Sequence, residues 1–247
     1  DLDYGDKPYH GDAGPITIRR YPSAEMGVQH TAFLEAARNL GYPDCPDAND
    51  PDSWGSGPQP MNKLGRLRVS CAIGYLAPAR ARRNLAIRPN ATARRIIVEN
   101  GRCAGVEIRN ADNSTEIIRA KLVVLAAGAL MTPAILMRSG LGPRAHLEQH
   151  GIPVVANIPG VGQNLSDHPA LSITMTPKDP SIIDHDKPII QTILRYTAEG
   201  SDKRNDLQIE MISFSGAKDR PQFAIAGVLE YQHGRGELTL ASANPDA

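Results

Sequence analysis

The residues best placed for ligand chemistry lie in the stretch KLVVLAAGALMTPAILMRSGLGP, which runs from Lys121 to Pro143. Leu122 to Ala127 form a continuous apolar run, and this predicts a strand that is buried on both faces. After Gly128, we predict a helix that begins at Thr132 and Pro133, because threonine caps helices and proline suits the first helical position. A helix that starts beyond the carboxyl end of a buried strand presents free N–H groups to nucleotides. The stretch therefore indicates nucleotide contact, with a purely structural turn as the alternative.

Other residue patterns are weaker candidates for chemistry. His146 and His150 are four residues apart, which is a spacing that binds metal ions on one helix face. No third ligand is evident, so a solvated helix end that stops at Gly151 is the better interpretation. No Ser or Cys occupies a strand-to-helix elbow, which argues against a nucleophilic hydrolase. The chain also lacks a Gly-rich loop ending in Lys-Ser or Lys-Thr, which excludes a P-loop.

Composition limits the classes of partner. The 247 residues are 41% hydrophobic, which is enough for one core or for two lobes around a shared sheet. The 27 basic and 27 acidic residues cancel, and aromatic residues make up only 4%, so we expect no nucleic-acid partner. No apolar run reaches the roughly 18 residues needed to span a membrane. Three scattered cysteines form no disulfide framework, and without a signal peptide they favour a cytoplasmic location.

Both ends of the chain resemble interior sequence. It opens with DLDYGDKPYHG, without an initiator Met, and it stops at ASANPDA directly after an alternating, strand-like run. We interpret the chain as an internal piece of a longer protein, or as one polypeptide of a cleaved one.

Periodicity predicts the elements that would position the candidate turn. A helix is expected within residues 24–42, ended by Gly41, and a long loop is expected over residues 45–60. Asn100-Gly101 between two alternating runs predicts a hairpin, and a third strand follows the turn NADNS to complete a β-meander. A short helix is expected near His146, and a longer one over residues 187–200.

Two alternating strands are expected over residues 206–216 and 221–232. In the first, Leu207, Ile209 and Met211 share one face, and the intervening residues share the other. These strands predict an antiparallel sheet that belongs to a second lobe.

Several segments together resemble a known family. AAGALMTPAILMRSGLGP is similar to a signature of the glucose-methanol-choline (GMC) oxidoreductases, with a Gly-Ala pair, a Ser/Thr-Pro and a terminal Ser-Gly-hydrophobic-Gly. Four further collinear segments resemble the same family: HGDAGPI from His10, RLRVSCAIGYLAPARARRNLAI from Arg66, GIPVVANIPGVGQNLSDHP from Gly151 and GRGELTLASANPDA from Gly234. The resemblance spans nearly the whole chain.

The resemblance implies a mixed α/β protein, part of a GMC-type FAD-binding domain with a β-meander, plus a substrate lobe with an antiparallel sheet. It assigns residues 1–77 to a substrate-lobe or lid segment that leads into the FAD domain, and residues 78–171 to the FAD domain. Residues 172–234 are assigned to the substrate lobe, and residues 235–247 begin the C-terminal segment. The implied cofactor is FAD, and the implied reaction is oxidation of an alcohol to a carbonyl compound.

The resemblance also implies roles for particular residues. Ala93 lies in the strand whose backbone contacts the adenine, and Ala127, Gly128 and Ala129 form the turn near the adenosine half of FAD. Glycine allows the backbone to approach a ligand closely. The residues Gln208, Glu210 and Ile212 are expected on the substrate side of the second sheet, with a merely solvated face as the alternative. No metal site is expected.

Two parts of the family pattern are missing from this sequence. These are the N-terminal Gly-x-Gly-x-x-Gly loop for the FAD pyrophosphate and the C-terminal histidine pair that takes the alcohol proton. None of the seven histidines matches that pair, so no catalytic residue is assigned. We expect a small alcohol as substrate, and companion polypeptides or further segments that complete the site. The alternatives are an FAD-containing hydroxynitrile lyase of the same family and a truncated fragment without catalysis.

Overall fold

The computed structural model describes residues 1–215 and 221–246. The chain divides into two compact units, each built from two stretches of sequence. Unit 1 comprises Asp1–Leu85 and His168–Gln232, and unit 2 comprises Ala86–Asp167 and His233–Ala247. Helices and antiparallel sheets occur together, which confirms the expected mixed α/β class. The functional assignment of the domain boundaries stays a prediction.

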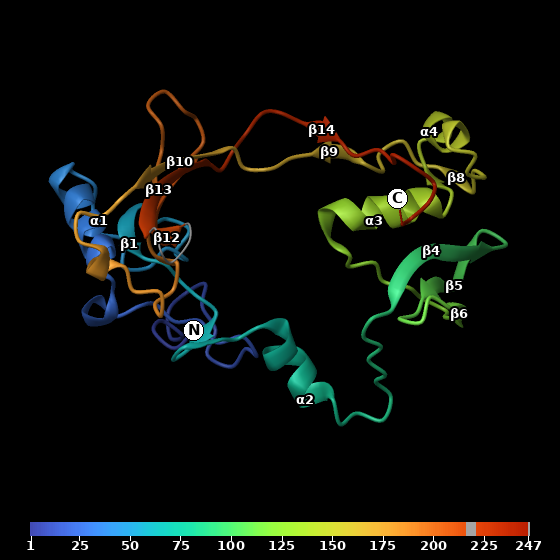
Figure 1. The fold of residues 1–247 in the computed structure, drawn as a ribbon, viewed down its shortest axis with the longest axis horizontal. Coiled ribbons are helices and arrows are strands. Elements are labelled where there is room, and N and C mark those ends of the chain that lie inside the picture. The colour runs from blue at the N-terminus through green and yellow to red at the C-terminus, as the bar shows by residue number, and fades with distance from the viewer. Residues whose placement is uncertain (216–220, 247) are drawn as a thin grey trace. The chain divides into compact units, whose positions relative to one another are not determined.

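Unit 1 is centred on a five-stranded antiparallel sheet in the order β1-β11-β12-β13-β10. Its strands are β1 (Gly55–Pro58), β10 (Ala170–Met175), β11 (Ile190–Tyr196), β12 (Leu207–Ser215) and β13 (Gln222–Leu229). Strands β1, β10, β12 and β13 of this sheet are labelled in Figure 1. Helix α1 (Val28–Asn39) packs against one face of this sheet. The helix ends as predicted, because Gly41 has a φ of 88° and the Tyr42 N–H donates to the Ala37 carbonyl at 3.1 Å.

The core of unit 1 lies between α1 and the sheet. Phe33 and Leu34 of α1 pack with Leu194 of β11 and Met211 of β12, and each of the four is at most 8% exposed. Ile209 packs against the same cluster. The predicted alternation along residues 207–212 is therefore confirmed, and the face with Gln208 and Glu210 points away from α1.

Short elements complete unit 1. They are a 3-10 turn at Ser23–Glu25, a hairpin of β2 (Lys63–Leu64) and β3 (Leu67–Arg68), a π-helical turn at Ala72–Leu76 that runs into α2 (Ala77–Ala79), and a 3-10 turn at Pro180–Ile182.

Unit 2 contains the predicted meander. Its strands are β4 (Thr92–Glu99), β5 (Arg102–Arg109) and β6 (Thr115–Arg119), and the β4–β5 turn places Asn100 and Gly101 at φ angles of 51° and 73°. Helix α3 (Gly128–Arg138) packs on β4 (Figure 1). The remaining elements are β7 (Leu141–Gly142), α4 (Arg144–Gln149), β8 (Ala156–Asn157), β9 (Gln163–Leu165) and β14 (Gly236–Glu237). A small core joins α3 to α4 through Met137 and Leu147.

The structure corrects the prediction for the candidate turn. Residues 122–126 form no strand, and Leu122 and Val124 are 77% and 79% exposed, because no strand in the described part of the chain pairs with them. The helix begins at Gly128 and not at Thr132, so Pro133 lies inside it. The predicted buried strand was therefore wrong for the described residues, because burial of an apolar run requires partner strands and covering layers that these residues do not include.

Two further predictions in unit 1 were wrong. Residues 187–200 contain strand β11 where a helix was expected, and the loop over residues 45–60 contains strand β1. Residues 191–194 of β11 are buried on both faces of a central strand, so they lack the alternation that marks a half-exposed strand. In the described residues, no helix is both long and apolar enough to cross a membrane.

Candidate functional site

The corner at Ala127, Gly128 and Ala129 exposes its main chain. Gly128 opens α3 with a φ of 81°, a conformation that glycine adopts without strain, and a Cβ built there meets no atom within 4 Å. Ala127 precedes the helix and its side chain makes no capping hydrogen bond. The first N–H groups of α3 therefore point out without an internal acceptor, as at any helix start. All three residues are exposed.

Pro133 adds an acceptor to this corner. An interior helical residue normally donates its N–H to the carbonyl four residues earlier, but proline has no N–H to donate. The Ala129 carbonyl is therefore left without its usual helical partner by Pro133. The corner offers both main-chain donors and a main-chain acceptor, and its own three residues carry no side chain larger than a methyl group.

Ala93 lies on β4, opposite Ile108 of β5, and it is half-buried. Helix α3 is joined to β4 by the Ile96 N–H, which donates to Ser139 Oγ at 2.7 Å. The structure therefore places the four predicted cofactor residues on two packed elements of unit 2. Exposed main chain at a glycine corner fits the adenosine end of FAD, so the residues present are compatible with this cofactor.

The three predicted substrate residues lie on β12 in unit 1. Gln208 Nε2 donates to Glu210 Oε1 at 2.6 Å, so the two side chains form a pair on the face that points away from α1. Burial raises the pKa of the Glu210 carboxyl. The hydrogen bond from Gln208 opposes this shift, and the charge of Glu230 adds to it. Ile212 lies opposite Ala224 of β13 on the same face.

A cavity of about 490 Å³ adjoins part of this face. Gln208 lines it together with Arg195, Arg204 and Glu230, whereas Glu210 and Ile212 are not among its lining residues. The structure thus brings Gln208 and Glu210 together, but of the two only Gln208 lines this cavity. Arg195 donates from Nη2 to Ser53 Oγ at 2.8 Å, while its buried Nε has no hydrogen-bond partner in the described structure.

The structure supports the structural interpretation of the two paired histidines. His146 and His150 flank the end of α4, with ring centroids 4.7 Å apart in an edge-to-face contact. His146 Nε2 accepts a hydrogen bond from the Leu240 N–H at 3.0 Å, so it is occupied. Among the residues that the structure describes, no group of three or more potential ligands could hold a metal ion.

A buried histidine network in unit 1 was not predicted. His30 of α1 is fully buried, and its ring nitrogens contact Thr192 Oγ1 at 2.9 Å and Ser213 Oγ at 2.6 Å. Ser213 Oγ donates to the Pro188 carbonyl, so it accepts from His30 Nε2–H, and Nδ1 accepts from Thr192. Burial lowers the pKa of His30 to about 4, and the charge of Lys187 acts in the same direction. This neutral histidine fastens α1 to β11 and β12.

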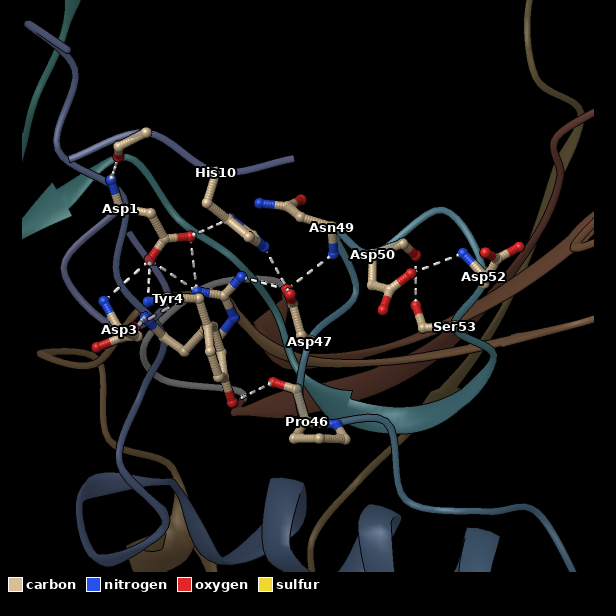
Figure 2. Close-up of polar contacts among 12 residues, drawn as sticks. Asp1, Asp3, Tyr4, His10, Pro46, Asp47, Asn49, Asp50, Asp52 and Ser53 are labelled. Carbon is tan, nitrogen blue, oxygen red and sulfur yellow. Dashed lines mark hydrogen bonds and ion pairs between the residues drawn. The ribbon is translucent and has the colours of Figure 1, made fainter. Parts of the chain in front are cut away.

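A charged cluster fastens residues 1–20 of unit 1 to the loop before β1 (Figure 2). His10 contacts Asp1 at 3.0 Å and Asp47 at 2.7 Å, and the Arg20 guanidinium contacts the carboxylates of Asp1, Asp3 and Asp47. Burial alone would raise the pKa of Asp47, but hydrogen bonds from the Asn49 N–H and His10, together with Arg20, hold this pKa below its ordinary value. Because each carboxylate is already paired, we assign the cluster a structural role, in which it holds the N-terminal residues against the loop before β1.

Known proteins match this chain in sequence and in fold. The family model for GMC oxidoreductases matches residues 9–170. An uncharacterized GMC-type oxidoreductase of Rhodococcus erythropolis is 34% identical over 242 residues, which cover 96% of this chain and 47% of that protein. The 5-(hydroxymethyl)furfural oxidase of Methylovorus sp. is 40% identical over 174 residues, which cover 70% of this chain and 33% of that protein.

A solved structure shows the same fold. Pyridoxine 4-oxidase from Mesorbium loti matches with a TM-score of 0.85 at 24% identity, over 96% of this chain and 48% of that one. The chain spans about half the length, or less, of the relatives that it matches.

Proposed function

Because this chain belongs to the GMC oxidoreductase family, we propose that it forms part of an FAD-dependent enzyme that oxidises an alcohol to a carbonyl compound. The observation that carries the proposal is the family match over residues 9–170, which includes Ala93 and the corner at Gly128. FAD is the cofactor that this membership supports, and when bound it supplies the redox chemistry by accepting a hydride at flavin N5. The related 5-(hydroxymethyl)furfural oxidase is named for a substrate that carries a hydroxymethyl group, which is an alcohol. This supports an alcohol as the donor here.

In this proposal the corner of unit 2 holds the adenosine end of FAD. Its exposed N–H groups and the Ala129 carbonyl are main-chain groups that can pair with the ribose and the adenine. Gly128 keeps the surface flat, because any other residue would place a side chain where the ligand packs. Ala93 supports the adenine from β4.

The β12 face of unit 1 orients the alcohol in this proposal. Gln208 and Glu210 form a hydrogen-bonded pair that can accept from and donate to a hydroxyl group, and Ile212 provides an apolar contact. The raised pKa of Glu210 reflects a site that is already partly shielded from water. These groups bind and orient the alcohol, and no residue of this chain is proposed to take the proton.

We further propose that polypeptide outside these residues covers the segment before α3. Leu122 and Val124 are highly exposed, and an extended apolar segment without a partner strand is an unfavourable surface. A partner strand would pair with its backbone groups, and a layer packed on the sheet face would bury both side chains. Native mass spectrometry of the active protein tests this, since a single 26.6 kDa chain with bound flavin and full activity would contradict it.

The reaction is tested by adding alcohols to the purified flavoprotein without oxygen. Loss of the yellow flavin absorbance, with one carbonyl product formed per flavin, is the expected result. If the flavin spectrum stays unchanged while a cyanohydrin is split, the protein is a lyase and the oxidation proposal is wrong.

A further inference from the structure

A small cavity of about 190 Å³ lies in unit 2, where β4, the end of α3 and the C-terminal segment meet. Most of its charged lining is arginine. The lining residues are Arg94, Arg95, Glu107, Arg138, Ala243 and Pro245, and we call this cavity the arginine pocket. Pockets for drug-sized ligands measure roughly 300–1,000 Å³, so this one suits a much smaller group.

A β-bulge brings two of the arginines to the same side of β4. Consecutive residues of a regular strand point to opposite faces, but the pairing of β4 with β5 shifts between Ala93 and Arg95, and Arg94 is the extra residue. Arg95 donates to Glu107 Oε2 from Nε at 3.0 Å and from Nη2 at 2.8 Å. Arg94 Nε lies 3.8 Å from Oε1 of the same carboxylate. Two consecutive guanidinium groups therefore face one carboxylate.

The third arginine is positioned by the end of α3. Ser139 Oγ accepts from the Ile96 N–H at 2.7 Å and donates to the Ile135 carbonyl at 2.6 Å, which fixes the last turn of α3 against β4. Arg138 directly precedes this serine and lines the pocket. Its guanidinium makes no hydrogen bond or ion pair with any residue that the structure describes. A partly buried cation without a counter-charge is unfavourable, so an anion beside Arg138 would stabilise the folded protein.

The arginine pocket carries an excess of positive charge. The Glu107 side chain is 16% exposed, and Arg95 already neutralises it at 2.8 Å. The nearest other carboxylate in this cluster is Asp246, which Arg109 binds at 2.6 Å and which lies 3.4 Å from Arg94. With Arg138, four guanidinium groups share these two carboxylates, so two positive charges stay uncompensated. The paired carboxylates therefore do not cancel the attraction for an anion.

The arginine pocket is separate from the cofactor contact proposed for Ala93. Ala93 lies opposite Ile108 of β5, whereas Arg95 lies opposite Glu107. Glu107 and Ile108 are consecutive residues of a strand, so their side chains point to opposite faces of the meander. A ligand in the arginine pocket and an adenine beside Ala93 would occupy different faces.

We propose that the arginine pocket binds a phosphate group, either as inorganic phosphate or as the end of a small phosphomonoester. A guanidinium presents its N–H donors in a planar fork that pairs with two phosphate oxygens. Arg138 offers a fork without a partner, and the contacts of Arg94 to carboxylates are long, at 3.4 Å and 3.8 Å. The two uncompensated positive charges match a phosphate dianion. A cation would be repelled by the same charges.

Phosphorus NMR tests the proposal, because exchange with a bound state broadens the phosphate resonance. With the purified protein at low ionic strength, where charges are least screened, the broadening should saturate with a dissociation constant of about 1 mM. Sulfate has the same tetrahedral shape and charge as the phosphate dianion and should compete equally. Chloride, at matched ionic strength, should compete about tenfold more weakly, because it cannot pair with a fork through two atoms.

Methyl phosphate distinguishes the two sources of the phosphate group. Tighter binding of methyl phosphate than of phosphate identifies a site for phosphomonoesters. Equal or weaker binding identifies a site for the free ion.

Variants of the lining test the part played by charge. Arg138→Gln and Arg94→Gln should each weaken phosphate binding about fivefold, because each removes one charged fork. Glu107→Gln should strengthen binding about threefold, since it frees Arg95 and removes a negative charge from the lining. Arg144→Gln is the matched control: Arg144 is an exposed arginine of α4 outside the pocket, and its variant should bind as the wild type does. Circular dichroism confirms that each variant is folded.

Three results would overturn the proposal. These are no saturable broadening up to about 20 mM phosphate, a value well above the expected constant, displacement of phosphate by chloride as effective as that by sulfate, or unchanged binding in the folded Arg138→Gln variant. Weaker binding in the folded Glu107→Gln variant would also contradict it, because excess positive charge would then not be the cause of binding.

Discussion

Acidification from pH 7 to pH 5 should destabilise unit 1 through His30. The folded protein lowers the pKa of this buried ring to about 4, against an ordinary value of 6.5, because burial disfavours the charged form. As the pH falls, the unfolded chain therefore binds the proton before the folded protein does. The stability that the neutral His30 ring contributes is fully present above pH 6.5 and is lost as the pH falls toward 4. Each unit of difference between the two pKa values is worth about 1.4 kcal/mol, which gives about 3 kcal/mol in total. Of this, about 2 kcal/mol should be lost between pH 7 and pH 5.

Urea unfolding followed by Trp54 emission measures this effect, because Trp54 lies in the same unit as His30. His30→Gln removes the titrating group, so we expect its unfolding free energy to change by less than about 0.5 kcal/mol over the same pH range. His233→Gln changes an exposed ring and should retain the full dependence of the wild type. Equal pH dependence in wild type and His30→Gln would refute the reasoning.

Two further substitutions follow from the same structure. A Cβ on Gly57 would overlap the carbonyl oxygen of Cys45, so Gly57→Ala should lower the unfolding free energy by about 3 kcal/mol in urea titrations. Gly14 has open space around it, so the control substitution Gly14→Ala should change the unfolding free energy by less than about 0.5 kcal/mol. Burial raises the pKa of Glu210, so the charged carboxylate destabilises the folded state increasingly as the pH rises above 4.5. Glu210→Gln should therefore raise the unfolding free energy by about 0.5 kcal/mol at pH 8 and leave it unchanged at pH 4. A loss of stability at pH 8 would contradict this sign.

Features set by neighbouring residues could be predicted from the sequence. Gly41 ends α1 because it alone adopts the required positive φ cheaply, and Asn100-Gly101 forms the hairpin turn for the same reason. The alternation along β12 also followed directly from the period of two, so the positions of Gln208 and Glu210 on one face were predictable.

Features set by distant residues could not be predicted in the same way. Strand β11 lies between two other strands, and its buried residues 191–194 have no alternation that could distinguish it from a helix. His30 meets Ser213 across 183 residues of sequence, and no local pattern announces this pair. The prediction of a buried strand from Leu122 was wrong for the opposite reason. The apolar composition of this run indicates burial, but no other described residues cover it.

Flavin content per chain tests the central claim that FAD lies against the corner at Gly128. The protein should carry one FAD, and Gly128→Val should lower this content at least about tenfold, because the new side chain occupies the ligand surface. Gly151→Val is the matched control in unit 2, since Gly151 also has a positive φ and open space around it, so the strain of about 1–2 kcal/mol is shared. The account predicts that the Gly151 variant keeps its FAD, and full FAD content in the folded Gly128 variant would contradict it.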